Sequence, residues 1–130
     1  MALKLRLKPG EKIIIGGAVI TNGERSADLM VENRVPILRE KDILTDADAD
    51  SPCRRIYLAV QLMYIDEDNL ARYHKTYWEL VKEVLNAAPS TRDHIEAISN
   101  EILAGRYFQA LKKTQQLIQY EQELLNHVRQ

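Results

Sequence analysis

The sequence predicts an α+β protein in which a small N-terminal antiparallel β-sheet precedes a four-helix C-terminal region. Up to about residue 45, apolar and polar side chains alternate, or β-branched residues form short runs between turn signals, which is typical of strands. From Ser51 onward, apolar residues recur at the spacing of amphipathic helices. We therefore divide the chain into a β-rich region, residues 1–45, and a helical region, residues 51–130.

The first predicted strand has one apolar and one cationic face. Leucines alternate with cations in the order Leu3, Lys4, Leu5, Arg6, Leu7 and Lys8. Because alternate residues of a strand lie about 6.6 Å apart on one face, the three cations are expected to form a row. Such a row is a candidate contact for a polyanion. The alternative is a solvated strand face whose charges protect an exposed edge from aggregation.

Turn signals separate the later strands of the β-rich region. Residues 8–11 contain Pro-Gly and predict a tight turn. Residues 13–20 are predicted to form one largely covered strand, in which Gly16 and Gly17 make a bulge or a close backbone approach. This strand is expected to end at a hairpin turn formed by Asn22 and Gly23.

A short alternating strand is then expected at residues 27–31, followed by an edge strand at residues 35–38, where Pro36 cannot donate to a central ladder. The acidic residues 46–50 resemble the start of a calcium loop. An EF-hand beginning there would need Gly and Glu at positions that Ser51 and Tyr57 occupy, so a solvated linker is the better interpretation and no metal site is expected.

Four helices are predicted after the linker, and each has a boundary signal. Ser51 precedes a Pro, as an N-cap does, and the acidic residues 66–69 separate the first two helices. Pro89 ends the second helix, and residues 90–93 resemble a capping box that starts the third. Gly105 is the expected C′ residue of the third helix.

The last helix has a wide apolar stripe. We expect part of it to mediate oligomerisation or partner binding, through Leu111, Leu117, Ile118, Leu124 and Leu125. Such a stripe is buried either within a helix bundle or in a seam between chains, and the sequence leaves both possibilities open. Thr114 and Glu121 interrupt the narrower seam and argue against a long autonomous coiled coil.

Composition restricts the function. Lys and Arg total 18 against 19 Asp and Glu, a net charge of −1, so binding of a polyanion would require a local patch. The apolar runs are too short to span a bilayer, and Cys53 is the only cysteine. The sequence therefore predicts a soluble, cytoplasmic protein without membrane contact.

Catalytic patterns are weak. No phosphate-binding or dinucleotide-binding glycine motif occurs, and His74, His94 and His127 lack partners at the spacing of metal ligands. Cys53 lies near a helix start but has no His base nearby in the sequence, which favours a small buried residue over a nucleophile. We expect no enzymatic activity, no catalytic residue and no cofactor.

Three blocks of sequence, residues 3–22, 35–45 and 54–64, occur in an order that resembles the FlbT family, flagellar-biosynthesis repressors of α-proteobacteria. The resemblance extends over nearly the whole chain. It implies post-transcriptional control, in which the protein binds the 5′ untranslated region of flagellin messenger RNA and limits its translation during flagellum assembly. It implies no enzymatic activity.

The N-terminal third also resembles the carbon storage regulator, a small β-strand protein that binds RNA loops. The matching residues are Leu5, Gly10, Glu11, Ile15, Gly16, Arg39, Glu40 and Ile43. The segment between the Gly-Glu turn and the Arg-Glu motif is shorter here than in that family. In that family the first strand and the Arg of the Arg-Glu motif flank the RNA. Together with the cation row, the resemblance gives the candidate RNA contacts Lys4, Leu5, Arg6, Lys8, Arg39 and Lys41.

Two functions remain in view. Because no aromatic residue precedes Tyr57, the β-rich region cannot stack bases as common RNA-binding sheets do, so RNA contact there would use cations, backbone groups and aliphatic edges. The first function is a repressor that binds the flagellin leader RNA through residues 1–45. The second is an adaptor without RNA binding, whose helical region holds flagellin, a flagellar regulatory protein or an assembly factor. A homo-oligomer is expected in either case.

Overall fold

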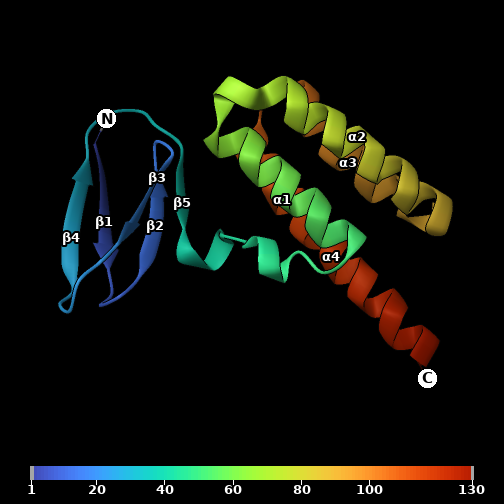
Figure 1. The fold of residues 1–130 in the computed structure, drawn as a ribbon, viewed down its shortest axis with the longest axis horizontal. Helices are drawn as coiled ribbons and strands as arrows, with labels where there is room; N and C mark the ends of the chain where they lie inside the picture. Colours follow the sequence, from blue (N-terminus) through green and yellow to red (C-terminus); the bar gives the residue numbers. More distant parts are fainter. Residues whose placement is uncertain (1, 130) are drawn as a thin grey trace. The chain divides into compact units, whose positions relative to one another are not determined.

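The computed structural model describes residues 2–129 and divides the chain into two compact units, each considered by itself (Figure 1). The first unit ends at Ile43 and contains the strands, and the second begins at Leu44 and contains the α-helices. The predicted fold class, N-terminal antiparallel strands followed by four helices, is confirmed within the described residues.

The β unit contains two antiparallel sheets within residues 2–43. In the first, β1 (Leu3–Leu7) pairs with β4 (Ala27–Val31). In the second, β2 (Lys12–Ile15) is the central strand between β3 (Ala18–Thr21) and β5 (Ile37–Arg39). The edge position of β5, which follows Pro36, agrees with the prediction.

The expectation of a single sheet is wrong, because β1 does not pair with the strand that follows it in the chain. Leu5 and Leu7 of β1 instead pack with Ile13 of β2 in one buried cluster. The turn at residues 8–11 is present, with the Glu11 N–H donating to the Lys8 carbonyl over 3.1 Å. The turn joins β1 to β2, which belong to different sheets but share a core. The apolar face of β1 packs in this core, while β4 supplies the backbone hydrogen bonds of β1.

A second correction concerns Gly16 and Gly17, which form a hairpin turn between β2 and β3 and not a bulge within one strand. Their φ angles are +57° and +88°, and positive φ at both central residues is what a type I′ turn requires. The expected hairpin at Asn22 and Gly23 is absent. There the Asn22 side-chain amide donates to the carbonyls of Lys8 and Arg25, over 2.8 and 2.9 Å, and fixes a loop.

The helical unit consists of α1 (Pro52–Ile65), α2 (Leu70–Ala87), α3 (Arg92–Leu103) and α4 (Tyr107–Arg129). α1 packs against both α2 and α4, and α3 packs against α4. The core is formed by the apolar stripes that the sequence predicted, with Ile56, Val60 and Met63 of α1 fully buried. A hydrogen bond of 2.8 Å between the hydroxyls of Tyr77 and Ser99 links α2 to α3 inside this core.

Most predicted helix boundaries are confirmed. The Ser51 hydroxyl accepts the Arg54 N–H at the start of α1. Gly105 has a φ of +75°, and the N–H groups of Gly105 and Arg106 bond to the last carbonyls of α3, as in a Schellman motif. The capping box at residues 90–93 is wrong, because residues 89–91 form a 3₁₀ turn in which the Thr91 hydroxyl donates back to Ala88.

The polar residue Glu121 in the stripe of α4 caps the start of α1. Its carboxylate accepts the Ser51 hydroxyl at 2.6 Å and the Cys53 N–H at 3.2 Å. A carboxylate at a helix N-terminus is favoured by the helix dipole as well as by these hydrogen bonds. Burial, with the nearby Glu121 charge, raises the pKa of the Cys53 thiol to about 12, which makes Cys53 a buried structural residue.

We expect Glu121→Ala to lower the free energy of unfolding by about 1–3 kcal/mol, because the Ser51 hydroxyl and the Cys53 N–H both lose their acceptor. Urea denaturation followed by far-ultraviolet circular dichroism measures the change. Glu123→Ala, on the exposed face of the same helix, is the matched control. Equal stability of the two variants would contradict the capping role.

Candidate nucleic-acid interface

A pocket of about 500 Å³, lined mainly by charged residues, lies where the turn after β1 meets the end of β5. Its lining residues come from these two segments: Lys8, Pro9, Gly10, Glu11, Arg39, Glu40 and Lys41. Gly10 has a φ of +71°, a conformation that glycine adopts readily, and this allows the tight turn that carries Lys8 and Glu11. A 3₁₀ turn, Glu40–Asp42, follows β5 and carries Lys41.

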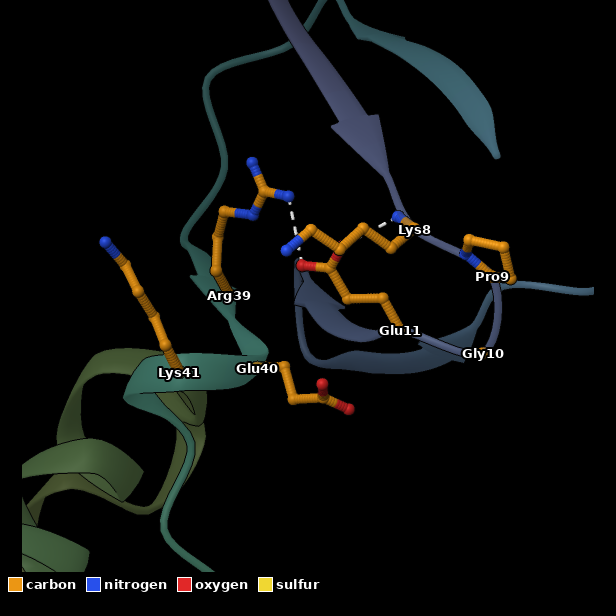
Figure 2. Close-up of a pocket in the computed structure, with 7 residues that line it drawn as sticks. All are labelled: Lys8, Pro9, Gly10, Glu11, Arg39, Glu40 and Lys41. Atoms are coloured by element: carbon orange, nitrogen blue, oxygen red, sulfur yellow. Dashed lines mark hydrogen bonds and ion pairs between the residues drawn. The ribbon is translucent and has the colours of Figure 1, made fainter. Parts of the chain in front are cut away.

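An ion pair between Arg39 and Glu11 lies at the centre of the pocket. Figure 2 shows the side chains of Lys8 and Arg39 directed toward Glu11, while Lys41 extends away from it. Arg39 Nη2 donates to Glu11 Oε2 over 3.0 Å and to the Arg6 carbonyl over 2.8 Å. The Lys8 N–H donates to the other Glu11 oxygen over 2.8 Å. The Lys8 hydrogen bond, followed by that of Arg39, lowers the pKa of Glu11 below its ordinary 4.5.

The cation row of the first strand is exposed, as predicted. Lys4, Arg6 and Lys8 are all exposed, and the Arg6 guanidinium pairs with Asp28, which lies opposite it on β4, over 3.2 Å. Leu5 is only 8% exposed and belongs to the core, so its side chain is not presented to a ligand. The edge of β1 that faces away from β4 has no partner strand among residues 2–43.

The candidate cations therefore fall into two groups. Arg6 and Arg39 are held by carboxylates. For the side-chain amines of Lys4, Lys8 and Lys41, the described part of the chain supplies no carboxylate within salt-bridge distance. The pocket brings Lys8, Arg39 and Lys41 together, and Arg39 connects them to β1 through the Arg6 carbonyl.

Sequence reasoning did not assign Glu11 to the site, although it orients Arg39. A signal was present, because the Gly10-Glu11 and Arg39-Glu40 pairs both belong to the residues that resemble the carbon storage regulator. Glu40 was also missed, and its carboxylate accepts the Lys12 N–H over 3.1 Å. Glu11 thus fixes the Lys8 backbone and the Arg39 guanidinium, and Glu40 fixes the backbone of Lys12.

The residues expected to mediate oligomerisation or partner binding do not share one environment. Leu111 and Leu117 are 1% and 0% exposed, because they pack inside the helical unit. Ile118 and Leu124 are half-buried, and Leu125 is 44% exposed. Only the later part of the stripe, which continues to the exposed Val128, is presented to another molecule.

The residues considered for catalysis or metal binding lie apart. His74 lies near Tyr107, and His94 lies against the ring of Tyr120 with centroids 5.0 Å apart. Within residues 2–129, no group of three or more His, Cys, Asp or Glu is arranged to hold a metal ion. None of the helices in this part of the chain is long and apolar enough to cross a membrane.

Comparison with known proteins identifies the family. The family model described as "Flagellar protein FlbT" matches residues 3–125. "Probable flagellum biosynthesis repressor protein FlbT 1" of Bradyrhizobium diazoefficiens is 50% identical over 125 residues, which cover 95% of this chain and 85% of that protein. A Rhodopseudomonas palustris relative, "Probable flagellum biosynthesis repressor protein FlbT", is 46% identical over 126 residues, or 97% of this chain and 99% of the relative.

A more distant relative, "Flagellum biosynthesis repressor protein FlbT" of Caulobacter vibrioides, is 38% identical over 130 residues, covering 98% of this chain and 92% of that protein. No solved structure matches the chain. The fold and the site define a small α+β protein with a cation-bearing β unit and a helical unit. The chain belongs to the FlbT family of flagellar proteins, which confirms the resemblance seen in the sequence.

The Glu11 carboxylate should make the stability of the β unit depend on pH. Because its pKa is lowered in the folded state, Glu11 stabilises the fold above its ordinary pKa of 4.5, and this contribution is lost as the pH falls through the lower, folded value. We expect Glu11→Gln to lower the thermal midpoint at about pH 7, with the difference from wild type shrinking below about pH 4.

Thermal unfolding at a series of pH values measures this difference. Glu24→Gln, at an exposed position of the same unit, is the control and should leave the midpoint unchanged. A Glu11→Gln difference that is constant over the pH series would contradict the role of the carboxylate.

Proposed function

We propose that this protein represses flagellum biosynthesis after transcription, by binding the 5′ untranslated region of flagellin messenger RNA through its β unit. The observation that carries the proposal is a set of cations on β1 and in the adjoining pocket. Lys4, Arg6 and Lys8 are exposed, and Lys8 and Lys41 line the pocket with the oriented Arg39. Because the whole chain has a net charge of −1, this local cluster is what can attract a polyanion. The relatives, which are named flagellum biosynthesis repressors, support the repressor role.

The pocket can contact both the phosphate and the base of a nucleotide. The amines of Lys8 and Lys41 suit phosphate oxygens. The second oxygen of the Glu40 carboxylate can accept a hydrogen bond from the exocyclic amino group of a base. The edge of β1 that has no partner strand adds backbone donors and acceptors, apart from the Arg6 carbonyl that Arg39 occupies, and these need no aromatic platform. A leader RNA held in this way is single-stranded at the site, and the protein bound to it would block its translation.

Salt dependence tests the proposed contacts. Five phosphate contacts to single-stranded RNA give a slope of log affinity against log salt of roughly −3.5. We expect Lys4→Gln, Lys8→Gln and Lys41→Gln in one protein to weaken binding of the flagellin leader strongly and to reduce the slope to roughly −1.4. Gel-shift titrations at several salt concentrations measure both quantities.

The matched control is Lys75→Gln with Lys82→Gln, which removes exposed cations from α2. It should leave the affinity and the slope near the wild-type values. If the folded β-unit variant binds the leader as wild type does, the assignment of these cations is wrong.

We also propose that the protein is at least a homodimer, formed through β3. All residues of β3 are exposed, including Val19 at 68% and Ile20 at 38%. The strand contains no charge or proline, and among the described residues only β2 pairs with it. An unprotected apolar edge of this kind pairs readily with another strand, and two copies of β3 can pair antiparallel about a two-fold axis.

Sedimentation analysis tests the dimer. Wild type should sediment as two or more chains of 15.0 kDa, and Val19→Lys should shift it toward the monomer because the charge blocks edge pairing. Leu103→Lys, at a 73% exposed position of α3, is the control. A wild-type monomer at high micromolar concentration would count against self-association.

The adaptor is the second candidate function, and the exposed end of the α4 stripe favours it. Leu125 and Val128 present apolar surface that a flagellin, a flagellar regulatory protein or an assembly factor could cover. The variant with Lys4→Gln, Lys8→Gln and Lys41→Gln separates the repressor from the adaptor. If it loses the protein partner and keeps the RNA, the adaptor function is correct and RNA repression by this site is wrong.

A further inference from the structure

The helical unit contains an apolar groove at the exposed end of α4. The cavity has a volume of about 630 Å³ and is bounded by the start of α1, the end of α2 and the last turns of α4. Its apolar lining includes Pro52, Val84, Ala87, Leu124, Leu125 and Val128. Cavities of this size with mainly apolar walls are typical binding sites for apolar side chains.

The groove is open because α4 is longer than the helices that cover it. Leu111 and Leu117, in the first half of the stripe, are covered by the rest of the unit. The final turns extend beyond the other helices (Figure 1), and there Leu125 is 44% and Val128 81% exposed. Exposed apolar side chains beside an apolar cavity indicate a binding surface.

The charges around the groove are negative on balance, although Arg54 pairs with one of its two acids, Asp50, over 3.0 Å. Asp50 and Glu121 are the charged side chains among its lining residues, and both are acidic. α2 also ends at the groove, and its last turn has no basic residue to balance the negative end of the helix dipole. An occupant with positive charge is therefore favoured.

We propose that this groove binds an amphipathic helix of a partner protein, with apolar residues at positions i, i+3 or i+4 and i+7 and with Lys or Arg beside them. Helices with these features dock in apolar grooves by placing successive apolar side chains along the groove. The inference deepens the proposed partner-binding role of the helical unit, and it does not depend on RNA binding.

A second copy of the same helix does not fit this surface as well. The end of α4 carries Glu121 and Glu123, which would bring further negative charge to a groove that is already acidic. Self-association has a neutral edge available on β3 instead.

A synthetic probe tests the proposal directly. A fluorescein-labelled peptide of about four helical turns carries Leu at the stated spacing and Lys elsewhere, and a second peptide has Glu in place of Lys. Fluorescence anisotropy with the full chain measures their affinities. We expect the Leu/Lys peptide to bind wild type at least about tenfold more tightly than the Leu/Glu peptide.

The protein variant is Leu125→Ser with Val128→Ser, and the control is Leu103→Ser. All three positions are exposed, so the fold should survive, and circular dichroism checks this. We expect the double variant to bind the Leu/Lys peptide at least about tenfold more weakly than wild type, and the control to bind it equally. Absence of binding to wild type, equal binding of both peptides, or unchanged binding by the double variant would overturn the proposal.

Two further measurements distinguish the other outcomes. If the double variant alone converts a dimer to a monomer in sedimentation, a second copy occupies the groove and the proposed partner helix is wrong. Gel shifts with the leader RNA should be identical for wild type and the double variant. If RNA binding fails for both while peptide binding follows the expected pattern, the proposed RNA function fails and the groove assignment stands.

Discussion

The β unit depends on the ion pair between Arg39 and Glu11. The guanidinium reaches two segments, because it donates to the Glu11 carboxylate in the turn after β1 and to the Arg6 carbonyl. It therefore fastens the short edge strand β5 to the strand that begins the other sheet. Since the Lys8 N–H holds the second Glu11 oxygen, the same carboxylate fixes the turn itself. This one interaction thus joins the two segments that carry the cations of the pocket.

The β unit is close to the lower size limit for an independent domain. It ends at Ile43, and units of about 40 residues bury too little apolar surface to be stable without further support. Its buried cluster consists of Leu5, Leu7 and Ile13, with partly buried residues around it. Edge pairing through β3 would supply such support, while the cations of β1 stay available for a polyanion. The proposed self-association and the proposed RNA contact would then use different strands of the unit.

The polar residues of the α4 stripe explain why this helix belongs to a bundle. Thr114 is fully buried, and its hydroxyl donates to the Ala110 carbonyl of the same helix. Its burial therefore leaves no polar group without a hydrogen-bond partner. Glu121 caps α1 and thereby fixes where α4 contacts the start of that helix. Beyond Glu121 the stripe is only partly covered by the described chain, and its apolar residues border the groove.

The sequence alone determined the features that local chemistry controls. Ser51 before Pro52 starts α1, and Gly105 ends α3, because capping depends on residues within one turn. The exposure of the cations on β1 followed from the two-residue period of a strand. Only the tertiary structure decided that β1 pairs with β4, that Glu11 orients Arg39, and that Glu121 caps a distant helix. These contacts join segments far apart in the chain, where period and turn propensity carry no information on which partner is chosen.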